Sequence, residues 1–143
     1  MSVFKRRLGQ YVTLNDDAWL DFDALERQEQ SFQPGDDMVR AGDEIRHVFI
    51  LLEGWAIRYR LLEDGRRQIV NFMLPGDIFD LQALSDLKAD HSVTAITRCR
   101  VSVITSTLFV GMLKDSARLA SAFWWSAVQE ESILREQIVR IGR

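Results

Sequence analysis

A series of glycines at even spacing limits the possible folds of this sequence more than any other pattern in it. The glycines stand at positions 35, 42, 54, 65 and 76, in steps of 7, 12, 11 and 11 residues. Four of them lie next to an aspartate, a combination that is typical of tight turns. Turns at this spacing, with strand-like runs between them, are typical of an antiparallel sandwich or jelly roll. The series therefore predicts a mainly β fold.

The runs between these turns have the composition of β-strands, because they are apolar and rich in β-branched and aromatic residues. They are Val48–Leu52, Trp55–Leu61 and Gln68–Met73, followed further along by Val93–Thr97 and Cys99–Ile104. Asp64-Gly65 is typical of a two-residue hairpin turn. We therefore expect Trp55–Leu61 to pair with Arg67–Met73.

The strand pattern is interrupted in the middle of the chain. We expect a turn at Pro75–Asp77, one short helical turn over Leu81–Leu84, a polar loop at residues 85–91, and a new strand from Ser92. Backbone N–H groups at such a break lack ladder partners, and they can bind an anion or cap a short helix. The break is the candidate ligand pocket. Its candidate residues are Asp80, Leu81, Gln82, Ala83, His91 and Ser92.

Helices are expected on both sides of the strands. Residues 1–13 show no clear periodicity, and we expect a loosely held arm there. An amphipathic helix is expected over Asn15–Arg27, with Asn15 as its N-cap. After the strands, Thr105 or Ser106 caps a short helix over Leu108–Leu113.

The last helix is long, from a cap at Asp115 or Ser116 to about Ile141. Some 26 residues make a helix of about 39 Å, which is too long to bury every turn on its own sheet. Its apolar residues follow a heptad seam with one polar member, Glu131. The seam residues are Ala120, Trp124, Ala127, Glu131, Leu134, Ile138 and Ile141. We expect two copies to pair along this seam as a parallel homodimer, the alternative being a helix packed on its own sheet alone.

Composition excludes several classes of protein. The net charge of −3 argues against a surface that coats nucleic acid. The single cysteine, Cys99, excludes an intrachain disulfide framework and a cysteine-ligated iron–sulfur cluster, and we expect its thiol to be packed within a strand. We find no signal peptide and no apolar run of transmembrane length, so we expect a soluble, cytoplasmic protein.

Several motifs occur in the order and spacing of a known family. Gly42-Asp43, Val48–Arg60, Glu63–Phe72, Pro75–Asp77 and Asp90–Val93 resemble the sensor domain of Crp/Fnr-type transcription regulators. The resemblance covers nearly the whole chain, from about residue 14 to residue 143.

This resemblance implies a cyclic-nucleotide-binding-like double-stranded β-helix, or jelly roll, over residues 14–113, with the arm at 1–13 before it and a dimerisation helix at 114–143 after it. It implies a homodimer whose candidate pocket senses an effector. In that family a helix-turn-helix domain normally follows the long helix. The sequence stops where the connection to it would begin, so we expect DNA contact only through a domain absent from this chain.

The resemblance does not extend to the residues that bind a cyclic nucleotide. Family members that do so carry a Gly-Glu pair after the turn, whose glutamate accepts from the ribose 2′-hydroxyl, and an Arg-Ser or Arg-Thr pair whose arginine meets the cyclic phosphate. Here the first pair falls on Asp80-Leu81 and the second on His91-Ser92. Leucine cannot hydrogen-bond a ribose, and histidine is a poor substitute for a guanidinium. We therefore expect no response to cAMP.

No cofactor is expected from the remaining residues. His47 and His91 are the only candidate axial ligands for a haem, and neither has supporting context.

Three functions stay open. The first is an effector-sensing and dimerisation domain with an unidentified effector. The second is a structural dimerisation module whose pocket is filled by its own side chains, namely Phe72, Phe79, Leu81 and Leu84. The third, more remote, is a cupin-like metal enzyme, for which two histidines 44 positions apart are too few. We therefore expect no catalytic residues, no metal site and no enzymatic activity.

Overall fold

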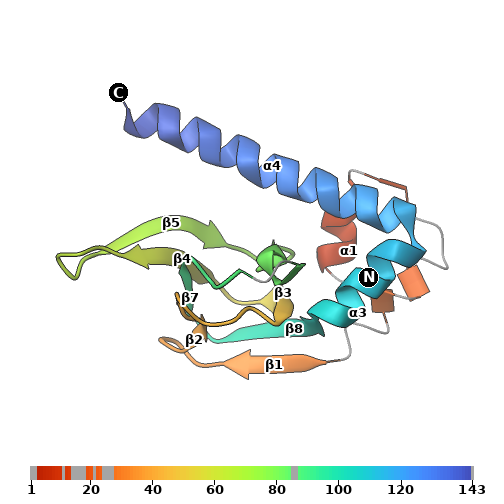
Figure 1. Cartoon of the computed structure of the whole chain (residues 1–143), viewed down its shortest axis with the longest axis horizontal. Helices are drawn as coiled ribbons and strands as arrows, with labels where there is room; N and C mark the ends of the chain where they lie inside the picture. Colours follow the sequence, from red (N-terminus) through yellow and green to blue (C-terminus); the bar gives the residue numbers. More distant parts are fainter. Residues whose placement is uncertain are drawn as a thin grey trace.

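Two four-stranded antiparallel sheets form the body of the protein, with two shorter helices at one end and a long helix that starts there and runs back along the sheets (Figure 1). The structure is a computed structural model, and it describes residues 3–10, 12–13, 19–20, 22–23, 28–84 and 87–142. One sheet has the strand order β1-β8-β3-β6 and the other β2-β7-β4-β5. This arrangement confirms the predicted jelly roll.

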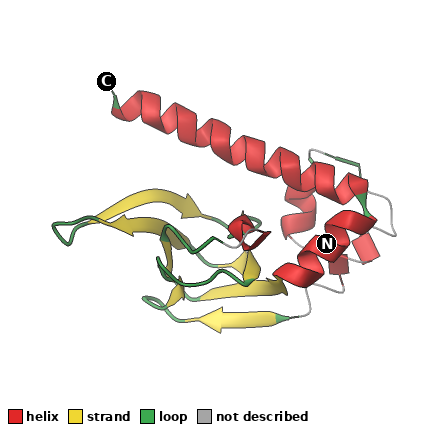
Figure 2. Ribbon diagram, in the orientation of Figure 1, coloured by secondary structure: helices red, strands yellow, loops and turns green. Residues whose placement is uncertain are grey.

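The strands are β1 (Glu29–Phe32), β2 (Asp37–Val39), β3 (His47–Glu53), β4 (Ala56–Leu61), β5 (Arg67–Met73), β6 (Ile78–Phe79), β7 (Ser92–Ala95) and β8 (Cys99–Thr105). The helices are α1 (Val3–Leu8), the 3-10 turn η1 (Leu81–Leu84), α3 (Ser106–Asp115) and α4 (Ala117–Ile141). Figure 2 shows the separation of the two kinds of element, with the helices at one end and α4 reaching back along the strands.

The predicted turns and hairpin are present. The five glycines of the series all have positive φ angles, between 82° and 94°. The hairpin pairs β4 with β5, from Ala56 opposite Met73 to Leu61 opposite Arg67. Each of the two Pro-Gly-Asp turns also contains a hydrogen bond to its aspartate side chain. Asp36 accepts from the backbone N–H of Gln33, and Asp77 accepts from the backbone N–H of Leu74, each at 2.7 Å.

Strand β3 lies between two apolar cores, which explains its unbroken run of apolar residues. Its Val48 and Ile50 face the helices, where they join Phe109 of α3 and Phe123 of α4. On the other side of β3, Phe49 and Leu51 belong to the core between the sheets. Cys99 is buried in that second core, as predicted for a strand thiol.

The N-terminal segment corrects one expectation. Residues 1–13 were expected to form a loose arm, but Val3–Leu8 is helix α1, and its Phe4 and Leu8 are buried. The Phe4 ring stacks on Phe22 at 4.7 Å between centroids and on Phe123 at 5.7 Å. A helix of six residues is too short to show a periodic pattern, and it gains its stability from these tertiary contacts.

The expected helix over Asn15–Arg27 lies largely outside the described residues. The described positions within it, Trp19, Leu20, Phe22 and Asp23, are helical. Phe22 is fully buried, in keeping with its place on the predicted apolar stripe.

Helix α4 begins and ends where the sequence predicts. The Ser116 side chain caps it by accepting a hydrogen bond from the N–H of Leu119 at 3.2 Å. Thr105 caps α3 in the same way. The described residues of α4 beyond Phe123 include no buried side chain. The apolar stripe of α4 is therefore not absorbed by the chain's own sheet.

Exposed side chains on α4 fall where the seam is predicted. Trp124, Glu131, Ile138 and Ile141 are exposed, with Trp124 at 72%. The other three seam residues are half-buried: Ala120, Ala127 and Leu134. The neighbouring Trp125 is 50% exposed, so neither tryptophan packs into the core of a single copy. The pairing of two copies along this face stays a prediction.

Candidate functional site

A cavity of about 350 Å³ lies between the jelly roll and α4. Its walls come from β4, β5, the segment from β6 to η1, and the residues that lead into β7, while α4 contributes Glu130. The predicted break in the strands thus forms one side of this cavity, and the hairpin and the long helix close the rest.

Asp80 turns the chain from β6 into η1. Its φ angle is +63°, a left-handed conformation that aspartate tolerates better than most residues. In the resemblance described above, this position corresponds to the glycine of the Gly-Glu pair in members that bind a cyclic nucleotide. The local geometry therefore agrees with the family pattern, although here a carboxylate is added at the same point.

That carboxylate holds His91. The Nε2 atom of His91 lies 3.0 Å from Oδ1 of Asp80, and its Nδ1 atom lies 2.5 Å from Oδ1 of Asp90. Asp80 and His91 are buried, whereas the Asp90 side chain is largely exposed. An imidazolium can donate to both carboxylates at once, so the geometry suits a protonated His91.

The charges around His91 shift its titration. Burial lowers the pKa of His91, but the hydrogen bonds to Asp80 and Asp90 outweigh it, and the pKa of His91 is raised overall. The nearby guanidinium of Arg58 acts against this rise. The hydrogen bond from His91 in turn lowers the pKa of Asp90. The three side chains form one ionic cluster at the end of the cavity.

A second ionic contact joins the jelly roll to α4. The Nη1 atom of Arg58 on β4 donates to Oε1 of Glu130 on α4 at 2.7 Å, and the side-chain amide of Asn71 on β5 donates to the same oxygen at 3.4 Å. The Arg58 side chain is 14% exposed and that of Glu130 is 35% exposed. This contact crosses 72 positions of sequence.

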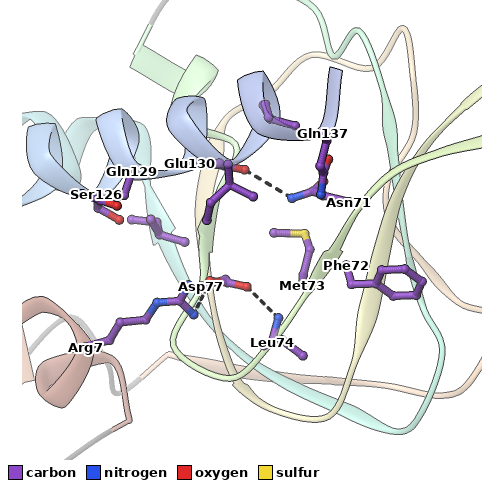
Figure 3. A pocket seen from close by; sticks show the side chains of 13 residues that line it. Arg7, Asn71, Phe72, Met73, Leu74, Asp77, Ser126, Gln129, Glu130 and Gln137 are labelled. Carbon is purple, nitrogen blue, oxygen red and sulfur yellow. Dashed lines mark hydrogen bonds and ion pairs between the residues drawn. The ribbon is translucent and has the colours of Figure 1, made fainter. Parts of the chain in front are cut away.

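A smaller cavity of about 270 Å³ lies on the other side of this contact (Figure 3). Asn71 and Met73 of β5 form one wall, and Glu130 and Gln137 of α4 face them. At its base, Arg7 of α1 makes an ion pair with Asp77. Burial raises the pKa of Asp77.

The six predicted pocket residues do not all reach the larger cavity. Asp80, Leu81, Gln82 and His91 line it. Ala83 is buried in the core beside the helices instead. The hydroxyl of Ser92 accepts a hydrogen bond from the backbone N–H of Ala41 at 3.0 Å, away from the cavity lining.

Several residues that line the cavity were not predicted as site residues. They include Arg58, Arg60, Val70, Asp90 and Glu130. In the sequence, Arg58 and Arg60 alternate with the apolar residues Ile57, Tyr59 and Leu61, a pattern typical of a strand with one polar face. No such pattern marks Glu130 in the sequence, because the heptad seam of α4 includes its neighbour Glu131 and not Glu130.

The part of the chain that the structure describes contains neither a metal-binding cluster nor a membrane-spanning helix. No group of three or more His, Cys, Asp or Glu side chains there is arranged to hold a metal ion. Among the helices described above, none combines the length and the apolar character needed to cross a bilayer.

The chain matches known proteins over most of its length. The family model for the cyclic nucleotide-binding domain matches residues 29–116. The nitrogen fixation regulation protein FixK of Bradyrhizobium diazoefficiens is 32% identical over 114 residues, which are 78% of this chain and 46% of FixK. The fumarate and nitrate reduction regulatory protein of Yersinia pestis is 30% identical over 92 residues, 64% of this chain and 37% of that protein.

The fold has a solved counterpart in the catabolite activator protein of Thermus thermophilus. The two superpose with a TM-score of 0.74 at 15% identity, over 94% of this chain and 61% of the other. The chain spans less than half the length of the two regulators above, at 46% and 37%. The sequence match and the fold agree: the chain belongs to the cyclic nucleotide-binding domain family and has homologues among the Crp/Fnr-type regulators.

Proposed function

We propose that this chain is the effector-sensing and dimerisation part of a Crp/Fnr-type transcription regulator, and that its effector is not cAMP. The observation that supports this is the cavity of about 350 Å³ whose lining includes both the jelly roll and Glu130 of α4. A ligand in that cavity can bias the position of the same helix whose outer face carries the predicted seam.

The side chains at the cavity do not fit a cyclic nucleotide. By the resemblance, Leu81 corresponds to the glutamate that meets the ribose in members that bind a cyclic nucleotide, and a leucine side chain offers no acceptor. Both ring nitrogens of His91 already face carboxylates, so they offer no free donor to a cyclic phosphate. Asp80 and Asp90 add negative charge beside the place where a phosphate would lie.

The open cavity supports a sensor rather than a module whose pocket is filled by its own side chains. Of the residues expected to fill it, Phe79 and Leu81 lie in its walls. Phe72 is 56% exposed and is not among its lining residues. The side chain of Leu84 lies outside the described part of the structure.

Dimerisation is proposed from the exposed stripe on α4. Trp124, Ile138 and Ile141 would be shielded from water if two helices paired along the predicted seam. Contact with DNA in the whole regulator would then be made by a region that corresponds to the part of the relatives outside the match with this chain.

Two measurements test this proposal. Sedimentation equilibrium from about 1 to 200 µM should show a reversible monomer–dimer exchange, and a single copy throughout that range would overturn the dimerisation role. A ligand at 100 times its dissociation constant stabilises the folded state by about 2.7 kcal/mol, so a bound nucleotide would raise the melting temperature. We expect thermal unfolding with millimolar cAMP to show no such stabilisation. A cAMP-dependent rise in melting temperature would show that cAMP does bind this pocket.

A further inference from the structure

Glu130 is shared by the two cavities that flank α4. It is the one residue of α4 among the described residues that line the larger cavity. Its carboxylate accepts from Arg58 and from Asn71, so it fastens α4 to both strands of the β4–β5 hairpin. The described part of α4 that follows Glu130 buries no side chain against the jelly roll. The position of that part therefore depends strongly on this one contact.

The other acids at the cavity are already engaged. Asp80 and Asp90 both face His91, which favours its protonated form. Among the described residues that line the larger cavity, Glu130 is therefore the acid that forms an ion pair with an arginine, Arg58.

The arginines at the cavity keep unused hydrogen-bonding capacity. Glu130 engages the Nη1 atom of Arg58, while the Nε atom of Arg58 is buried without a hydrogen-bond partner in the described structure. Arg60 lies two residues further along the same strand, lines the same cavity, and makes no ion pair with any described residue. A guanidinium with a free edge favours a planar, bidentate anion.

We propose that the effector is a small carboxylate that replaces the Glu130 carboxylate on Arg58 and so releases the second half of α4. This inference rests on the proposed sensing function and names the chemistry of its ligand. An exchange of one carboxylate for another keeps the local charge constant, whereas an added anion would have to enter beside three acids. Glu130 is then an internal competitor of the effector, and the Arg58–Glu130 pair is the contact through which binding reaches α4.

The test uses the whole chain and simple probes. Binding of acetate, succinate and inorganic phosphate is measured by calorimetry at constant ionic strength, with succinamide as the neutral analogue of succinate. Hydrogen exchange of the amides at 131–142 reports the release of α4. The variants are Glu130→Gln, Arg58→Gln and Arg58→Lys, and Glu136→Gln is the control because it removes one charge from an exposed i,i+4 pair on the same helix.

We expect Glu130→Gln to bind acetate and succinate at least fivefold more tightly than the natural sequence, while Glu136→Gln stays within twofold. Arg58→Gln should bind at least tenfold more weakly, and Arg58→Lys, which keeps the charge but not the planar fork, should also bind more weakly. Succinamide should not bind. In the absence of ligand, Glu130→Gln should exchange faster at 131–142, and succinate should bring the natural sequence toward that rate.

Three outcomes would overturn the proposal: no binding of either carboxylate to the natural sequence or to Glu130→Gln, equal binding by these two proteins, or tighter binding of phosphate than of the carboxylates. Each would leave the self-association measured by sedimentation untouched. Failure of this inference is therefore distinguishable from failure of the dimerisation role.

Discussion

At the scale of single residues, Asp80 combines a left-handed backbone with a buried carboxylate. Its Oδ2 atom has no hydrogen-bond partner among the described residues, while its Oδ1 atom lies 3.0 Å from Nε2 of His91. A buried acid that loses its one cationic partner is costly, by about 3 to 5 kcal/mol for a buried pair. This makes His91 a structural residue as well as a lining residue of the cavity.

The raised pKa of His91 predicts how stability depends on pH. A group whose pKa is raised on folding stabilises the folded state fully below its unfolded value, here 6.5, and that contribution is lost as the pH rises through the folded value. We therefore expect the free energy of unfolding to fall as the pH is raised above about 6.5. Urea titrations between pH 5.5 and 9 measure it.

His91→Gln should remove most of this pH dependence, because glutamine does not titrate. Asp90 does not contribute to the change in stability over this pH range. Its pKa is lowered on folding, so its contribution to the free energy of unfolding is lost only below its ordinary pKa of 3.8. An unchanged slope in the variant would show that another group causes the effect.

Gly54 is a residue where the backbone leaves no room for a side chain. A Cβ atom there would lie 2.3 Å from the carbonyl oxygen of Arg98 and 2.8 Å from the Cys99 sulfur, and the φ angle is +90°. We expect Gly54→Ala to destabilise the protein by about 3 kcal/mol or more, since strain and overpacking add. Urea unfolding checks this.

Gly65 supplies the matched control, because its φ angle is +82° but no atom lies within 4 Å of the added Cβ. Gly65→Ala should cost about 1 kcal/mol, from the backbone conformation alone. Equal losses in the two variants would contradict the steric argument.

At the scale of elements, local signals predicted most of the fold. The hairpin, the caps at Thr105 and Ser116, and the extent of α4 depend on residues that are close in sequence. Helix α1 was missed because its stability comes from the distant partners of Phe4. For the site, the turn at Pro75–Asp77 was predictable from turn chemistry. Glu130 was not predictable, since its contact with Arg58 depends on how α4 lies across the hairpin.

The heptad seam of α4 gives a prediction at this scale. Glu131 is the polar member of the seam and is exposed in a single copy, where it pairs with Arg135. If the seam joins two copies, Glu131→Leu should tighten the dimer at least about tenfold, because burying one leucine contributes about 1.5 to 3 kcal/mol. Sedimentation equilibrium gives the dissociation constant.

The control for this experiment is Glu136→Leu, which adds the same apolar side chain at an exposed position outside the seam. It should leave the dissociation constant nearly unchanged. A Glu131→Leu dimer that is no tighter than the natural one would mean that the seam is assigned wrongly.

At the scale of the whole molecule, Phe4 joins both ends of the chain. Its ring contacts Phe22 and Phe123, so the N-terminal helix and α4 share one core. Phe4→Ala should reduce the free energy of unfolding by about 3 to 5 kcal/mol, the usual range for a fully buried phenylalanine. Arg6→Ala, at an exposed position of the same helix, should change it by about 0.5 kcal/mol or less. Equal effects would show that α1 is not part of the core.

The one-sided anchoring of α4 also has a mechanical consequence. The first part of the helix is fixed by the buried side chains of Leu119, Ala122 and Phe123. Glu130 makes a further contact near the middle of the helix, which then continues to Ile141. Those last 11 residues make an arm of about 16 Å at 1.5 Å per residue. A tilt of about 10° at the base would move the C-terminal end of this segment by roughly 3 Å, so a small change of angle near Glu130 would become a displacement of several ångströms at the end of α4.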